Sequence, residues 1–162
     1  MAKLANEFSW SVSRSQLFDE CRRAYYYQYY GSWGGWERDT SDATRQLYIL
    51  KNIKSLPMWA GTIVHEIIAE ALNRYARSKH EIQTGELQAR ARHKLREGWV
   101  DAVTGKWRQT PKKTNLHELY YGNGKTLPAE MTDAIKQRVY DCLEAFASSE
   151  ILARITAIPY LN

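Results

Sequence analysis

Apolar residues recur at intervals of three and four along most of this chain, which is the spacing of one face of an α-helix. The first such stretch follows Ser13 and Gln16, which fit a capping box, and extends to a glycine-rich loop that begins at Gly31. The same spacing predicts helices over 41–54, from about 58 to 77, over 82–103 and from 128 to about 146. Residues 104–128 are rich in Gly, Pro, Asn and Lys, which favours an irregular connection. The pattern therefore predicts about five helices.

The last twelve residues, 151–162, have a different character. Apolar and β-branched residues such as Ile151, Ile155 and Thr156 follow one another closely, which favours a β-strand. A lone strand leaves its backbone groups without partners, so such a strand is expected to belong to a larger sheet. The expected fold is mainly α, a single helical domain over residues 1–162 with a C-terminal strand, and the chain is expected to stop inside a larger fold.

The composition limits the class of protein. The chain has 162 residues, of which 44% are hydrophobic, enough for the core of one domain. Two cysteines, Cys21 and Cys142, are too few for a disulfide scaffold or for a four-thiolate zinc or iron–sulfur site. There is no secretory leader and no apolar run of about 18 residues, so we expect a soluble cytoplasmic protein without a membrane partner.

The charge balance is mildly basic, with 23 Lys and Arg against 18 Asp and Glu and a net charge of +5. This balance is compatible with a nucleic-acid partner but does not require one. The most basic stretch lies between residues 88 and 113, where Trp99 and Trp107 are interleaved, and a smaller basic set lies on the first predicted helix. Phosphate contacts and an ordinary solvated helix surface both explain this pattern. The candidates for nucleic-acid contact are Arg14, Arg22, Arg23, Arg90, Lys94, Arg108, Lys112 and Lys113.

His65 is the candidate metal ligand. It lies at the edge of the apolar stripe of the third predicted helix, where an imidazole could reach into a cleft or could be a boundary residue without a ligand. A metal-dependent hydrolase also needs clustered acidic groups, often with a Lys, yet none of the twelve Glu residues has a Lys two positions later. Glu66 and Glu70 are expected to face solvent, and Cys21 is expected to pack on the apolar face of its helix.

Three segments occur in a distinctive order: residues 8–14 (FSWSVSR), 18–27 (FDECRRAYYY) and 61–66 (GTIVHE). Together with the aromatic loop at 29–36 (YYGSWGGW), they resemble the start of RecB-like nucleases of the PD-(D/E)XK superfamily. The resemblance implies the helical N-terminal part of an α/β nuclease fold that hydrolyses DNA with Mg²⁺ or Mn²⁺. It also implies that His65 contributes to the metal site. Cys21 stands where some relatives place the first of four iron–sulfur cysteines, but the other three are missing here, so no cluster is expected.

The chain lacks the catalytic motifs of this family. The catalytic Asp, the Glu-x-Lys on the next strand and the later Gln-x-x-x-Tyr helix are absent, so no catalytic residue is assigned in this chain. One imidazole cannot hold Mg²⁺, which prefers oxygen ligands, so the chain alone is expected to be inactive. The chain is then a truncated or split nuclease half, a half completed by a second chain, or a non-catalytic module that binds nucleic acid or protein. The remaining alternative is a truncated product that self-associates through an exposed apolar edge.

Overall fold

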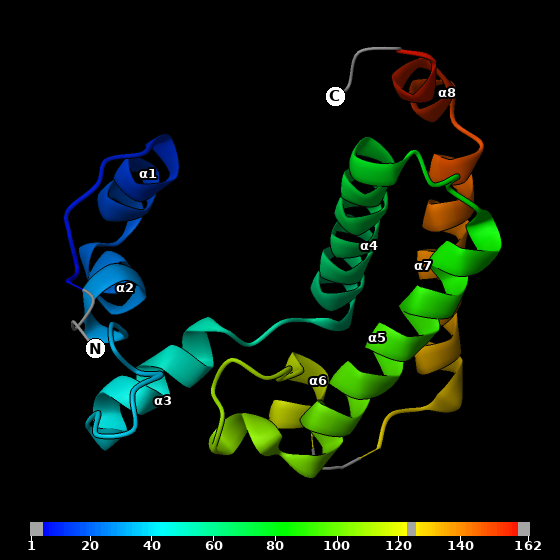
Figure 1. Cartoon of the computed structure of the whole chain (residues 1–162). Coiled ribbons are helices and arrows are strands. Elements are labelled where there is room, and N and C mark those ends of the chain that lie inside the picture. Colours follow the sequence, from blue (N-terminus) through cyan, green and yellow to red (C-terminus); the bar gives the residue numbers. More distant parts are fainter. Residues whose placement is uncertain (1–4, 123–125, 159–162) are drawn as a thin grey trace. The chain divides into compact units, whose positions relative to one another are not determined.

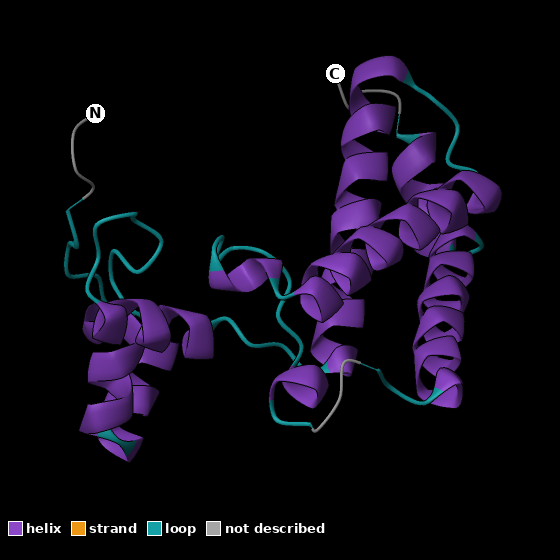
Figure 2. Cartoon of the chain, turned by 90° about the horizontal axis from the view of Figure 1, so that it is seen from below, coloured by secondary structure: helices purple, strands orange, loops and turns teal. Residues whose placement is uncertain are grey.

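The computed structural model describes residues 5–122 and 126–158, and these residues form a mainly helical protein (Figure 1). Within them there are eight α-helices, a π-helical turn and a 3-10 turn, and no strand (Figure 2). The elements are α1 (Val12–Glu20), α2 (Arg22–Tyr26), the π turn η1 (Tyr27–Gly31), α3 (Asp42–Lys51), α4 (Leu56–Ser78), α5 (Thr84–Thr104), the 3-10 turn η2 (Lys106–Arg108), α6 (His117–Tyr120), α7 (Ala129–Ala147) and α8 (Glu150–Ala157).

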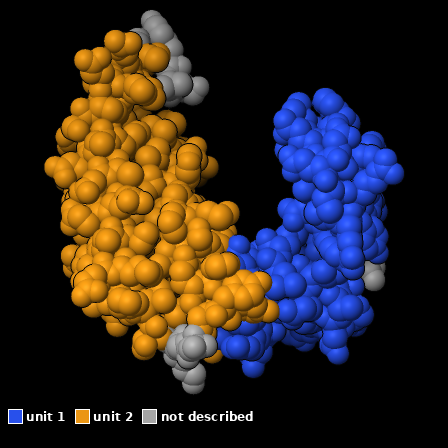
Figure 3. Space-filling model, turned by 180° about the vertical axis from the view of Figure 1, so that it is seen from behind, with its two compact units in different colours: residues 1–53, 105–115 blue, residues 54–104, 116–162 orange. Residues whose placement is uncertain are grey.

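The chain divides into two compact units (Figure 3). Unit 1 comprises residues 1–53 and 105–115, and unit 2 comprises residues 54–104 and 116–162. The first unit therefore holds α1, α2, η1, α3 and η2, and the second holds α4 to α8. None of the helices in the described residues combines the length and the apolar character that crossing a bilayer requires.

Unit 2 is built on α4, α5 and α7, which pack against one another (Figure 1). Their apolar stripes meet in a core where Ile67, Ala91 and Leu143 are completely buried. The Ser55 hydroxyl accepts a hydrogen bond from the Met58 amide and caps α4, and Pro57 suits the first turn because its missing amide would have no partner there. The helical periodicity of the sequence therefore gives this bundle directly.

Three hydrogen bonds connect the short helices α6 and α8 to this bundle. The Leu56 amide, at the start of α4, donates to Glu118 Oε1 of α6 at 2.9 Å, and the His117 amide donates to the Lys54 carbonyl at 2.9 Å. At the other end, the Tyr75 hydroxyl of α4 donates to the Thr156 carbonyl of α8 at 2.8 Å. These hydrogen bonds hold α6 and α8 in place, because each helix is too short to bury a long apolar face.

Unit 1 is held together differently, because neither α1 nor α2 contains a buried residue. Aromatic rings form its contacts, and the π-helical turn η1 lets Tyr25 touch both Tyr29 and Tyr30, at ring-centroid distances of 5.1 and 5.8 Å. The following loop packs on α3 at Gly35, where a Cβ would collide with the Tyr48 side chain. Aromatic packing around η1 thus replaces the aliphatic core that unit 2 has.

The single first helix of the sequence prediction is wrong, since it is divided at Cys21. Cys21 has an extended backbone, φ −159° and ψ 101°, and its thiol accepts a hydrogen bond from the Ala24 amide at 3.4 Å, which caps α2. The Cys21 side chain is exposed, so its predicted packing on an apolar face is also wrong. The cap of α1 is Ser11 rather than Ser13, because Ser11 Oγ accepts from the Arg14 amide.

The predicted C-terminal strand is wrong as well, since Glu150–Ala157 form α8. The Ser149 hydroxyl caps this helix at the Leu152 amide, and Leu152, Ile155 and Thr156 lie on one helical face that turns toward the protein. With no neighbouring strand among the described residues, helix formation satisfies the backbone where a strand would not. Residues 159–162 lie outside the described residues. Eight α-helices replace the predicted five because α2, α6 and α8 were not anticipated.

Candidate nucleic-acid interface

His65 lies on α4 and is exposed. In residues 5–122 and 126–158, no group of three or more His, Cys, Asp or Glu side chains is placed to hold a metal ion. The neighbouring carboxylates Glu66 and Glu70 are already paired with cations of α5. Mg²⁺ and Mn²⁺ prefer several oxygen ligands, so the described residues do not by themselves fit such an ion.

The predicted basic residues of α5 have partners within unit 2. Lys94 Nζ lies 2.8 Å from Glu66 Oε2 and 2.9 Å from Glu70 Oε1, and the Arg90 guanidinium contacts Glu70. The pKa of Glu70 is lowered by the hydrogen bonds from Arg90 and then Lys94, and that of Lys94 is raised by the hydrogen bonds to Glu66 and then Glu70. These cations therefore join α4 to α5.

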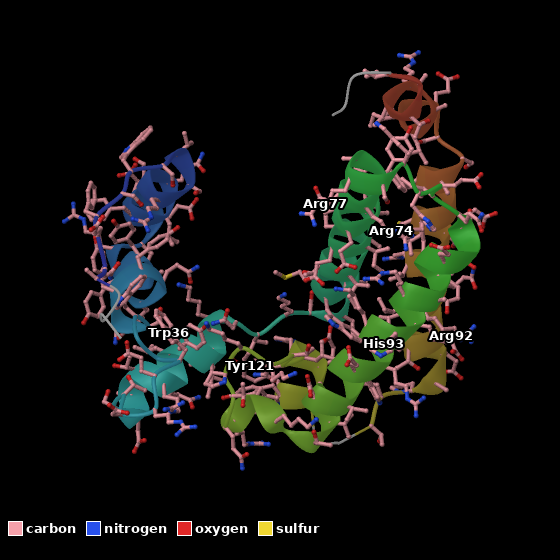
Figure 4. All side chains as sticks on the ribbon, in the orientation of Figure 1. Trp36, Arg74, Arg77, Arg92, His93 and Tyr121 are labelled. Carbon is pink, nitrogen blue, oxygen red and sulfur yellow. The ribbon has the colours of Figure 1, made fainter. Side chains whose placement is uncertain are left out.

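The remaining cations of this bundle are distributed over several faces. Arg74 and Arg77 lie on α4, and Arg92 and His93 lie on α5 (Figure 4). Arg74 pairs with Glu86 of α5, and His93 Nδ1 lies 3.2 Å from Glu97 Oε2. His80, His93 and His117 are exposed. Unit 2 thus presents mixed charge rather than one basic face.

The whole net charge of the chain belongs to unit 1. Its sequence has eleven Lys and Arg against six Asp and Glu, whereas unit 2 has twelve of each. Unit 1 therefore carries +5 and unit 2 carries zero. An excess of this sign attracts polyanions to unit 1 selectively.

The three predicted arginines of unit 1 lie against aromatic rings. Their guanidinium carbons lie 4.2 Å from the Tyr29 ring centroid for Arg14, 5.2 Å from that of Phe18 for Arg22 and 5.7 Å from that of Tyr27 for Arg23. Within the part of the chain that the structure describes, none of the three pairs with a carboxylate. Arg14 donates one hydrogen bond to the Ser9 carbonyl, and Arg23 Nε donates to the Tyr27 hydroxyl at 3.1 Å. The remaining N–H groups at the edge of a guanidinium are the donors that a phosphate oxygen can accept.

Lys51 is a further cation at the same ring, and no pattern in the sequence indicated it. Its ammonium donates to the Gln28 carbonyl at 2.6 Å and lies 5.9 Å from the Tyr29 ring centroid. Burial, and then the nearby positive charge of Arg14, lower the pKa of Lys51. Two cations therefore share Tyr29 without a neutralising anion, which is a favourable place for a bound phosphate.

A cavity of about 350 Å³ opens beside these cations. Five of its lining residues are aromatic, and Arg14 supplies its only guanidinium. The lining residues are Phe8, Ser9, Trp10, Arg14, Ser15, Phe18, Tyr25 and Tyr30. Arg14 is fixed in this wall because its guanidinium donates to the Ser9 carbonyl at 2.6 Å. The cavity thus combines flat apolar surfaces with a positioned positive charge.

The other predicted cations of unit 1 come from the segment 105–115. The Arg108 guanidinium lies 4.3 Å from the Trp107 ring, and Lys112 Nζ lies 5.7 Å from the ring of Trp36, which Figure 4 labels. Trp36 is itself held by Tyr48 of α3, at a ring-centroid distance of 5.5 Å. Arg108 therefore contacts a ring of its own segment, whereas Lys112 contacts a ring of the loop after η1.

The chain thus combines a mainly helical structure with a basic, aromatic surface on unit 1. The sequence model of the PD-(D/E)XK nuclease superfamily matches residues 9–154, and this chain belongs to that superfamily. No curated protein and no solved structure matches the chain. The superfamily predicted from the order of the three segments is confirmed, and so is the mainly α character.

Proposed function

We propose that this chain is the helical, DNA-contacting part of a RecB-like nuclease that hydrolyses phosphodiesters with Mg²⁺ or Mn²⁺. The observation that carries the proposal is the superfamily match over residues 9–154. Nucleases of this superfamily generally use Mg²⁺ or Mn²⁺ and act on nucleic acid, so DNA is the natural partner. The mildly basic sequence, with all of its net charge in unit 1, supports the same partner.

The proposal assigns phosphate contacts mainly to unit 1. Its contributors are Arg14, Arg22, Arg23, Arg108, Lys112 and Lys113. Arg90 and Lys94 are assigned instead to the α4–α5 contact, because carboxylates of Glu66 and Glu70 already neutralise them. Arg14, Arg22, Arg23, Arg108 and Lys112 each lie against an aromatic ring, whereas a cation paired with a carboxylate gains less from a phosphate.

The proposal gives the described residues no catalytic step, because they do not supply a metal-ligand group. His65 is proposed as one contributor to a metal site whose oxygen ligands lie outside the described residues. A single imidazole holds Mg²⁺ poorly, so the 162-residue chain alone is expected to bind DNA without cutting it.

An assay of the purified chain tests both halves of this proposal. Fluorescently labelled DNA is followed by anisotropy to measure binding and by denaturing gel to measure cutting, with Mg²⁺ or Mn²⁺ and with EDTA. The expected result is binding that weakens steeply with salt and leaves the strands intact. Cutting that EDTA abolishes would contradict the inactive state of the chain, and absence of binding at low salt would contradict the DNA partner.

A non-catalytic binding module is the second candidate, favoured by the missing ligand group in the described residues. It also predicts binding without cutting, so a different measurement separates the two. The DNA downstream of codon 162 and the neighbouring genes are read for an Asp-bearing strand followed by Glu-x-Lys. Their presence would support the nuclease, and their absence would favour the binding module.

A further inference from the structure

We propose that unit 2 binds a small anionic amphiphile, which is a molecule with a hydrocarbon body and one negatively charged group, in a cavity between α4, α5 and α7. The described residues that line this cavity all belong to unit 2, and none of them is among the residues proposed to contact DNA. The site is therefore distinct from the candidate nucleic-acid interface, and it does not depend on the proposed function.

The lining of the cavity is mainly apolar. Its volume of about 460 Å³ lies within the range, roughly 300–1,000 Å³, of small-molecule sites. Trp59 and Ile135 are buried in the bundle core, while Leu95, Trp99 and Leu127 are partly buried and pack against that core. A hydrocarbon that covers such side chains leaves water and is stabilised in proportion to the area that it buries. The lining therefore fits a hydrocarbon body.

The lining has few uncharged polar groups. Besides the indole N–H groups of its two tryptophans, the described lining residues contribute the hydroxyls of Thr126 and Thr132. Thr132 Oγ1 already donates to the Ala129 carbonyl at 2.8 Å. A nucleotide base carries several donors and acceptors along its edge, and each one that is buried without a partner costs free energy. The cavity therefore fits a hydrocarbon better than a base.

The charged groups at the cavity leave an excess of positive charge. Arg92 and Arg96 lie one turn apart on α5, and Asp133 and Lys136 belong to α7. Lys136 Nζ lies 3.1 Å from Asp133 Oδ1, so these two charges neutralise each other. Among residues 5–122 and 126–158, no carboxylate pairs with Arg92 or Arg96. Two uncompensated arginines beside an apolar cavity favour a ligand with an anionic group.

Arg92 is positioned to hold that anionic group. Its Nε donates to the Tyr140 hydroxyl of α7 at 3.4 Å, so the side chain, which Figure 4 labels, reaches from α5 to α7. The terminal N–H groups of the guanidinium remain available for an anion, in the planar arrangement that matches a carboxylate or a phosphate. Arg96 adds a second cation at the same cavity. Charge complementarity thus selects an anionic amphiphile over a neutral or a cationic one.

The test uses the full chain and two fluorescent probes that differ by one charge. Anilinonaphthalene sulfonate carries a sulfonate, and phenylnaphthylamine has the same rings without it. Both probes brighten in an apolar site, so titration gives their dissociation constants. Dodecanoate, below its micelle concentration, should displace the sulfonate probe. Dodecyltrimethylammonium, which has the same chain length and a positive head group, should not.

Two pairs of variants locate the site and its charge. Ala129→Trp fills the cavity from α7 and should remove the binding of both probes, whereas Ala134→Trp, on the same helix but outside the lining, should not. Arg96→Gln should weaken binding of the sulfonate probe about three- to tenfold, as expected for a charge-assisted hydrogen bond near the surface, and leave the neutral probe unchanged. Arg77→Gln removes an exposed cation of α4 outside the cavity and should affect neither probe. Circular dichroism should show equal helix content in every variant.

The exposed rings of unit 1 also attract such probes, so only the fluorescence that Ala129→Trp removes reports on this cavity. Unchanged binding in Ala129→Trp would show that the cavity is not the site. An equal loss of both probes in Arg96→Gln, or equal displacement by dodecanoate and dodecyltrimethylammonium, would overturn the preference for an anion. Displacement of that fluorescence by DNA would overturn the separate site and assign the cavity to the nucleic-acid interface.

Discussion

The two units of this chain use the same kinds of residue in opposite ways. Unit 2 places aliphatic residues inside a three-helix bundle and pairs Arg90 and Lys94 with Glu66 and Glu70. Unit 1 leaves Phe8 and Trp10 exposed and sets Arg14 against an aromatic ring. The difference shows that a basic residue is informative about partners only when its neighbours are known.

The largest expected effect is on the free energy of unfolding. It tests whether apolar side chains stabilise the fold in unit 2 but not on the exposed surface of unit 1. Leu143 is completely buried between the helices of unit 2, so Leu143→Ala should lower the free energy of unfolding by about 2–5 kcal/mol. Phe8→Ala removes a larger but exposed side chain of unit 1 and should change it by about 0.5 kcal/mol or less. Urea denaturation followed by circular dichroism measures both. Equal losses of stability in the two variants would contradict this distinction between the buried residues of unit 2 and the exposed rings of unit 1.

The bundle and the interface could be predicted from the sequence to different extents. The periodicities of α4, α5 and α7 are predictive because each helix buries one continuous face. The break at Cys21 could not be predicted, since it depends on one thiol capping one amide. In α8 the β-branched residues suggested a strand, but the Ser149 cap favours a helix, and residues 5–122 and 126–158 contain no partner strand.

The candidate site shows the same limit. Arg14, Arg22 and Arg23 could be identified as a basic set on the first predicted helix, although the sequence did not indicate that Arg14 contacts the distant Tyr29. Lys51 could not, because it joins Tyr29 through the packing of α3 on η1. The pairing of Arg90 with Glu70 was equally hidden, since the two residues are on different helices. The sequence therefore indicates which residues are basic, whereas their partners depend on how the helices pack.

The next prediction compares the cations of the two units by their effect on DNA binding. Arg14→Ala should weaken DNA binding and reduce the salt slope of the affinity by about 0.7–0.9, the contribution of one phosphate contact. Arg90→Ala should leave the slope unchanged, because Glu70 already pairs with Arg90. Titrations at several salt concentrations measure the slopes. The distinction between paired and stacked cations would fail if both variants changed the slope equally.

The smallest effect concerns the ion pairs that hold α4 against α5. Glu70 is partly exposed, so Glu70→Gln should lower the free energy of unfolding by about 1 kcal/mol or less near neutral pH. Arg90 and Lys94 depress the folded-state pKa of Glu70 below its ordinary value of 4.5. The stabilisation is therefore fully present above pH 4.5 and is lost as the pH falls through the folded-state pKa.

Urea denaturation of wild type and Glu70→Gln, measured at neutral pH and at steps below pH 4.5, checks this dependence. The difference between the two proteins should shrink as the pH falls, because protonation gives wild-type Glu70 the neutral charge of the variant. Phe8→Ala, whose side chain does not titrate, should show the same difference from wild type at every pH. A Glu70→Gln difference that grew with acidity would mean that the carboxylate destabilises the bundle. In that case the ion pairs would not stabilise the protein, and Arg90 and Lys94 would be as available to DNA as the cations of unit 1.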